Sequence, residues 1–162
     1  MTVVLGLDPG TRHFGWGVVE RRGTRLIHVA HGIAHTDVSA AIATRLVTIE
    51  SVLVEVVREH RPAEASVEAL FFAKDAQAAA KLGHARGVAL LVCARAGLEV
   101  HEYAPARVKL ALAGNGRAEK AQVAQMVRVV LGLHMAPKGD AADALALAIA
   151  HLQHIRMPRG VQ

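Results

Sequence analysis

The sequence predicts an α/β domain built on a five-stranded mixed sheet with helices on both faces. Three short apolar segments occupy the first 34 residues, at the close spacing that is typical of strands joined by tight turns. After them, two further short apolar segments alternate with segments whose hydrophobic residues recur at the helical period. The chain of 162 residues is 52% hydrophobic and 20% charged, which excludes a disordered protein and favours a single domain.

The first three elements are expected to form an antiparallel meander. Residues 3–8 are an apolar run that ends at a Pro-Gly turn, and residues 14–20 follow as a second strand. A turn-like segment at 21–24 leads into a third strand at 26–34. Connections this short leave no room for a crossover helix, so neighbouring strands must run in opposite directions.

The hydrophobic period then changes to that of a helix. Ser39 is a candidate N-cap, and apolar residues recur at helical spacing up to about His60. Pro62 lacks the backbone donor that the helix would need, so we expect the helix to end before it. Residues 65–68 are predicted to form a short buried strand.

The second half of the chain alternates helix and strand. Asp75 is a candidate N-cap for a helix at 76–96, and Gly97 suits the left-handed position that follows a helix. Residues 98–103 are predicted to be the fifth strand.

Three further helices are predicted toward the C-terminus. They cover residues 105–113, 118–131 and 140–154, and Asp140 is a candidate N-cap of the last one. We expect one domain over residues 1–155, followed by a frayed tail at 156–162.

The positive charge is concentrated in the middle of the chain. The net charge of the whole sequence is +5, from 19 basic and 14 acidic side chains. A solvated helix face is one explanation for the middle segment, and a polyanionic partner such as nucleic acid is the other. The basic residues of this segment are Lys74, Lys81, Arg86, Arg95, Arg107, Lys109, Arg117, Lys120 and Arg128.

Compartment and membrane contact are constrained by composition. No apolar run approaches the roughly 18–20 residues of a membrane span, and the first residues do not resemble a secretion signal. The single cysteine, Cys93, cannot form an internal disulfide and is expected in the core. These features lead us to expect a cytoplasmic protein.

Ten histidines raise the question of a zinc site. His28 and His31 lie on a predicted strand, where a separation of three places side chains on opposite faces. His151 and His154 have no partner cysteine. We therefore expect solvent-facing histidines and no zinc site.

Four acidic residues occupy positions that favour a metal centre. Asp8 and Glu68 each end an apolar strand, and Asp140 and Asp143 are three residues apart on a predicted helix. Ligands of open α/β sheets bind at the carboxyl ends of parallel strands, where such acids would converge. Clustered carboxylates need a compensating cation, and two Mg²⁺ ions would support phosphodiester hydrolysis. The structural alternatives are an N-cap at Asp140 and a turn residue at Asp8.

Six motifs in a fixed order resemble those of the RuvC family of Holliday junction resolvases. They are GLDPG, EALFFAK, KLGHARG, EYAPARVK, AEK and DAADALA, at residues 6–10, 68–74, 81–87, 102–109, 118–120 and 140–146. Gly15 and Gly17 accompany the first motif, and the resemblance covers residues 2–154 in one register. The first motif alone is weak, whereas the ordered set is highly specific.

This resemblance implies an RNase H-like fold and a homodimer. It further implies an Mg²⁺-dependent endodeoxyribonuclease of DNA recombination and repair, with Mn²⁺ as a substitute ion, that nicks two opposed strands of a four-way junction symmetrically. The implied partners are four-way junction DNA and the branch-migration proteins RuvA and RuvB. The implied catalytic residues are Asp8, Glu68, Asp140, Asp143, Lys109 and Lys120, the four acids also being the metal ligands. The third acid varies between Asp and His among relatives, and here it is Asp140.

The resemblance also places an aromatic side chain near the DNA crossover, at Phe71. An exposed ring can stack on a base, whereas a buried Phe71-Phe72 pair is the structural alternative, and we assign Phe72 to the core. Small residues between 76 and 96, Gly83 and Gly87 among them, make that helix our candidate dimer interface. The expected DNA-contacting residues are Phe71, Lys74, Lys81, Arg86, Lys109, Arg117 and Lys120.

Three other functions remain as alternatives. Residues 5–11 also resemble the first phosphate loop of the actin and sugar-kinase group, but those ATP-binding proteins need two such domains, and 162 residues supply one. An RNase H-like nuclease acting on RNA is the second alternative. A junction-binding protein without activity is the third, and the complete set of carboxylates argues against it.

Overall fold

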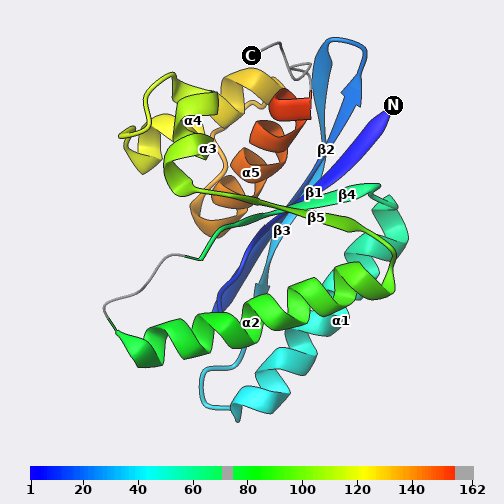
Figure 1. Cartoon of the computed structure of the whole chain (residues 1–162), viewed down its shortest axis with the longest axis vertical. Helices are drawn as coiled ribbons and strands as arrows, with labels where there is room; N and C mark the ends of the chain where they lie inside the picture. The colour runs from blue at the N-terminus through cyan, green and yellow to red at the C-terminus, as the bar shows by residue number, and fades with distance from the viewer. Residues whose placement is uncertain (71–74, 156–162) are drawn as a thin grey trace, which may run out of the picture.

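The computed structural model describes residues 1–70 and 75–155, and within them it contains one five-stranded mixed sheet (Figure 1). The strand order is β3-β2-β1-β4-β5. β2 is antiparallel to β1 and β3, whereas β1, β4 and β5 are parallel, so both the predicted meander and the mixed sheet are confirmed. The strands are β1 (Thr2–Asp8), β2 (His13–Arg22), β3 (Arg25–His35), β4 (Glu64–Glu68) and β5 (Glu99–Tyr103).

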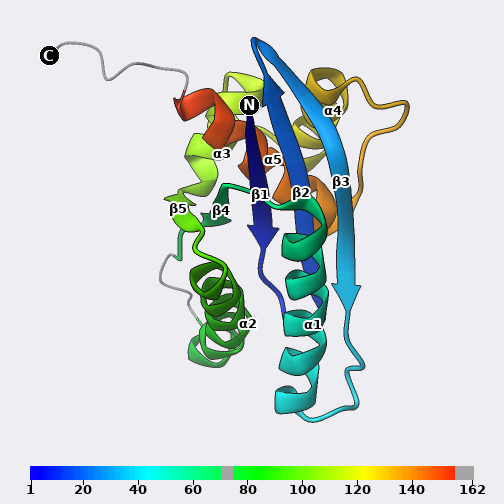
Figure 2. The ribbon, with the colours of Figure 1, turned by 90° about the vertical axis from the view of Figure 1, so that its right-hand side faces the viewer.

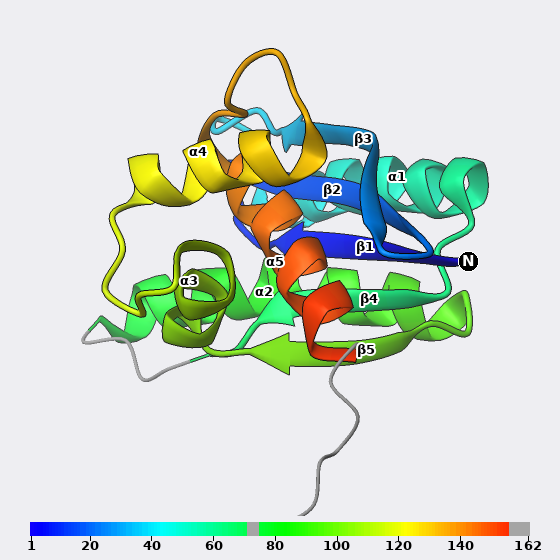
Figure 3. The ribbon, with the colours of Figure 1, turned by 90° about the horizontal axis from the view of Figure 1, so that it is seen from above.

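Helices cover both faces of this sheet, as Figures 2 and 3 show. One face carries α1 (Ile42–His60) and α2 (Ala76–Arg95), and the other carries α5 (Gly139–Ile155). α3 (Pro105–Ala113) and α4 (Lys120–Leu131) pack against α5. The sheet is therefore the middle layer of three.

Strand alternation divides the interior into two cores. Leu5 and Leu7 pack toward α1 and α2, whereas Val4 lies in the core on the α5 side. Side chains two residues apart on a strand share a face. Asp8, four residues after Val4, consequently lies on the α5 side, at the end of β1.

Glycines let α5 approach the sheet closely. A Cβ added to Gly6 would overlap the carbonyl oxygen of Ala144, and one added to Gly15 would overlap the backbone of Asp140. α5 matches these positions with a fully buried face that includes Ala144 and Ala148. α5 therefore packs directly on β1 and β2.

The element boundaries agree with the predictions at most positions. Asp75 caps α2, since its carboxylate accepts a hydrogen bond from the backbone N–H of Gln77 at 2.9 Å, and Gly97 follows that helix at φ +73°. α3 has the predicted bounds, and α4 begins at Lys120, two residues later than expected. Cys93 is buried in the core, as expected, and burial raises the pKa of its thiol to about 11.

Two predicted helix caps are wrong. α1 begins at Ile42, and the backbone N–H and hydroxyl of Ser39 instead donate to Asp37 Oδ1, at 2.9 and 2.7 Å. Asp37 forms this local turn in competition with a helix start. α5 begins at Gly139, so Asp140 lies inside the first turn and its carboxylate is available for another role.

Across residues 1–70 and 75–155, no helix has the length and apolar character that crossing a membrane requires.

Candidate active site

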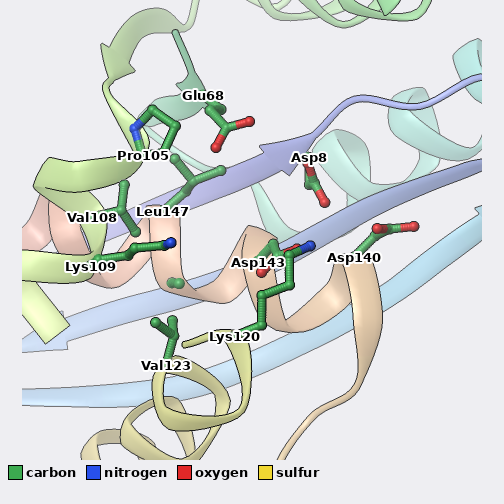
Figure 4. A pocket seen from close by; sticks show the side chains of 11 residues that line it. Asp8, Glu68, Pro105, Val108, Lys109, Lys120, Val123, Asp140, Asp143 and Leu147 are labelled. Carbon is green, nitrogen blue, oxygen red and sulfur yellow. The ribbon is translucent and has the colours of Figure 1, made fainter. Parts of the chain in front are cut away.

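All four predicted carboxylates line one cleft at the carboxyl edge of the parallel strands. Its volume is about 220 Å³. Figure 4 shows the side chains of the four acids and of two lysines around it. The cleft is lined by Asp8, Glu68, Pro105, Val108, Lys109, Lys120, Val123, Asp140, Asp143, Ala146 and Leu147.

Parallel pairing brings the two strand-end acids together. Leu7 of β1 pairs with Val67 of β4, so Asp8 and Glu68 are the next residues on adjacent strands. Both belong to the α5 face by alternation. The inference from the sequence, that acids ending neighbouring parallel strands converge, is confirmed by this register.

The first turn of α5 supplies the other two acids. Asp140 and Asp143 lie three residues apart, a spacing that places both on one side of a helix. One carboxylate oxygen from each of Asp8, Asp140 and Asp143 lies within 4.8 Å of the other two. Glu68 is outside this group of three and lies across the same cleft.

Crowding of negative charge controls the protonation of the site. Burial, followed by the charges of Asp143, Asp140 and Glu68, raises the pKa of Asp8 from 3.8 to about 8. Partial desolvation and the charge of Asp143 also raise the pKa of Glu68, against the opposing effect of the two lysines. These carboxylates ionise together only when a cation compensates them.

The donor set fits a hard divalent cation. Asp8, Asp140 and Asp143 offer oxygen ligands alone, close enough to share one ion, and Glu68 adds a fourth carboxylate across the cleft. Mg²⁺ and Mn²⁺ prefer such oxygen donors and keep other positions for water and phosphate oxygens. The site therefore meets the requirements of a divalent metal centre.

Two lysines reach the cleft from different helices. Lys120, the first residue of α4, donates from Nζ to Asp143 Oδ2 at 3.2 Å, and this carboxylate raises the pKa of Lys120. The Lys120 side chain remains 84% exposed, so its ammonium is accessible to a ligand. Lys109 of α3 is half-buried and points into the cleft (Figure 4).

The remaining predicted DNA contacts fall in different environments. Lys81 on α2 and Arg117, between α3 and α4, are exposed. Arg86 is buried, and its Nη2 lies 2.9 Å from Glu102 Oε1, so it already has a partner within the protein. Phe71, Phe72 and Lys74 lie outside the described residues.

The histidine predictions are partly wrong. Val18 pairs with Ala30 and Val19 with His28, so Val29 has no partner in the ladder and forms a β-bulge. The extra residue reverses the alternation, and His28 and His31 share a face, with Nε2 and Nδ1 2.7 Å apart.

His151 was expected to face solvent, and it is buried. Its Nε2 lies near Glu64 and its ring stacks on His101. Helical spacing could have predicted this burial, because His151 follows Asp140 by eleven residues, or about three turns, and so lies on the same face of the helix. Glu64 likewise has the same strand parity as Glu68.

Comparison with known proteins places this site in a family context. The model of the family "Crossover junction endodeoxyribonuclease RuvC" matches residues 4–151. The RuvC of Sorangium cellulosum is 59% identical over 92% of this chain and 83% of its own length, and that of Ruegeria pomeroyi is 51% identical over 91% and 89%. The structure of T. thermophilus RuvC in complex with a Holliday junction substrate matches with a TM-score of 0.91 at 39% identity, over 96% of both chains.

Proposed function

The chain belongs to the RuvC family of crossover junction endodeoxyribonucleases, and we propose that it resolves four-way DNA junctions by one nick in each of two opposed strands. One observation carries this proposal: four carboxylates and two lysines from five separate elements line a single cleft. A relative with a TM-score of 0.91 is described in complex with a Holliday junction substrate, which favours the same substrate here.

The four acids are proposed as the ligands of the metal. Asp8, Asp140 and Asp143 would hold one ion, and Glu68 with Asp8 would hold a second, Mg²⁺ being the ion and Mn²⁺ its substitute. When bound, the ions supply a Lewis acid that polarises the scissile phosphate and lowers the pKa of the attacking water. The protein contributes a fixed set of negative charges at the sheet edge.

The two lysines are proposed to act on the phosphate. Lys109 is half-buried, so its ammonium is positioned to hold a non-bridging phosphate oxygen and to offset the charge that develops in the transition state. Lys120 is exposed and bound to Asp143, and it can exchange this carboxylate for DNA as substrate enters. Both are therefore proposed as catalytic residues.

The wider DNA contact is proposed to be electrostatic. Lys81 and Arg117 are exposed and available to phosphates. Phe71 stays in the proposal on the family resemblance, and Lys74 on its place in the basic middle segment of the sequence. The ion pair between Arg86 and Glu102 counts against a direct phosphate contact by Arg86. Contacts of this kind anchor the backbone without reading sequence.

We also propose that the protein acts as a homodimer. A two-fold dimer places two identical clefts on opposed strands, which gives paired nicks by symmetry. α2 is the candidate interface, because a Cβ added at Gly83 or Gly87 would meet no atom of the described chain within 4 Å. RuvA and RuvB are proposed partners from the family resemblance.

A cleavage assay tests the function. The purified protein is incubated with Mg²⁺ and a synthetic four-way DNA junction, alongside a linear duplex of the same sequence and an RNA–DNA hybrid. We expect paired, symmetric nicks in the junction alone, and none with an Asp8→Asn variant. Cleavage of the hybrid in preference to the junction would instead support a nuclease acting on RNA.

A further inference from the structure

We propose that Glu64, His101 and His151 form a second metal site, suited to Zn²⁺, at the opposite end of α5 from the carboxylate cleft. One ligand atom from each of the three residues lies within 4.8 Å of the other two. This site is separate from the carboxylate cleft, and the proposal does not depend on the proposed function.

Three elements bring the ligands together. Glu64 begins β4, and His101 lies in the middle of the adjacent parallel strand β5, both on the face that α5 covers. His151, in the last turns of α5, lies above them, and its ring stacks on that of His101 with centroids 4.3 Å apart. The ligands therefore join the sheet to the helix.

The distances are close to those of a coordinated ion. Glu64 Oε2 lies 2.5 Å from His151 Nε2 and 3.5 Å from His101 Nε2. Two ligands bound tetrahedrally to one Zn²⁺ at about 2.0–2.1 Å lie about 3.3 Å apart. A small outward shift of the His151–Glu64 pair would accommodate the ion.

His101 supplies an independent observation. Its Nε2 is buried and has no hydrogen-bond partner among the described residues, although Glu64 and Glu99 oxygens lie 3.5 and 3.6 Å away. A buried imidazole nitrogen without a partner is costly. Coordination of a cation by this nitrogen would remove the cost.

Tyr103 orients the other histidine. Its hydroxyl oxygen lies 2.6 Å from His151 Nδ1. When a cation replaces the proton that Nε2 donates to Glu64, Nδ1 donates to the Tyr103 oxygen and the lone pair of Nε2 faces the ion, which is the arrangement that second-shell groups impose on metal-binding histidines.

Ligand chemistry separates the two sites. Two imidazoles and one carboxylate form a recurrent ligand set for Zn²⁺, whereas the carboxylate cleft offers hard oxygen donors alone. His151 lies eight residues after Asp143 and eleven after Asp140, which is roughly 12–16 Å along the helix axis. Bound Zn²⁺ would tie β4, β5 and α5 together, and these include elements that carry the cleft acids.

The test measures Zn²⁺ binding to the untagged, full-length protein by equilibrium dialysis, with excess Mg²⁺ to occupy the carboxylate cleft. We expect one Zn²⁺ per chain, a rise in Tm on binding, and visible absorption bands of tetrahedral Co²⁺ when Co²⁺ replaces it. His101→Gln is expected to weaken binding on the order of 100-fold, because it removes one of three ligands. This variant keeps the Tyr103–His151 hydrogen bond. Glu64→Gln, which replaces the carboxylate ligand, is the second variant.

His28→Gln is the matched control, since His28 and His31 form another close histidine pair on β3. It is expected to bind Zn²⁺ as the wild type does. Circular dichroism in EDTA establishes that each variant is folded. The proposal is overturned if the wild type binds no more Zn²⁺ than a folded His101→Gln, or if His28→Gln loses the bound ion.

Discussion

Replacing Asp8 with Asn is expected to stabilise the metal-free protein at neutral and alkaline pH, even though it removes a proposed catalytic residue. Burial and the neighbouring acids raise the pKa of Asp8 from 3.8 to about 8. Between these two values the folded protein holds a proton that the unfolded chain has released. The free energy of unfolding therefore falls as pH rises through this window. Throughout it, ionisation of the Asp8 carboxyl group destabilises the folded state relative to the unfolded chain.

The size of the effect follows from the pKa. Each pH unit inside the window removes up to about 1.4 kcal/mol, so a rise from pH 5 to pH 8 has an upper limit of about 4 kcal/mol. Water and counter-ions in an open cleft reduce this, and we expect about 1–3 kcal/mol. Asn has nearly the same shape as Asp and no charge to titrate, so the variant is expected to escape this loss.

Urea unfolding in EDTA at pH 5 and pH 8 measures the difference. Asp75→Asn is the matched control, because Asp75 is an exposed N-cap and Asn caps a helix equally well. We expect the free energy of unfolding of the control to depend on pH as that of the wild type does. When Mg²⁺ replaces EDTA at pH 8, we expect it to stabilise the wild type and the control, and to stabilise Asp8→Asn far less. Equal pH dependence in wild type and Asp8→Asn would refute the argument.

Three further predictions concern packing, catalysis and charge. Gly15→Ala is expected to lower the free energy of unfolding by more than about 2 kcal/mol, because the new Cβ overlaps the Asp140 backbone, and an unchanged value in urea unfolding would contradict this. Lys109→Ala is expected to slow single-turnover cleavage more than it weakens junction binding, and equal losses would make Lys109 an anchoring residue. Junction affinity, measured by fluorescence anisotropy, is expected to fall steeply between about 50 and 200 mM salt, and a flat response would remove phosphate contacts from the proposal.

Local sequence was sufficient for most of the fold. Proline and glycine positions, helical periodicity and the Asp75 cap depend on neighbours within a few residues, so they can be recognised without tertiary information. The failure at Ser39 has the same local scale, because its hydroxyl and backbone N–H donate to Asp37, two residues earlier, and the hydroxyl does not cap the helix.

The four acids of the cleft could also be predicted from the sequence. Asp8 and Glu68 end apolar strands, and the spacing of Asp140 and Asp143 places them on one helix face. The sequence thus determined which carboxylates to consider and which edge of the sheet they would occupy. It also determined the family, through motifs in a fixed order.

Tertiary structure alone decided how these groups affect one another. The pKa of Asp8 depends on distances to acids as many as 135 residues away, which are set by how closely α5 approaches Gly6 and Gly15. One bulged residue in β3 reversed the side-chain alternation expected for His28 and His31. The burial of His151 beside Glu64 and His101 joins three elements. Electrostatic and coordination effects depend on distances in space, and residues distant in sequence acquire those distances only when helices and sheet pack.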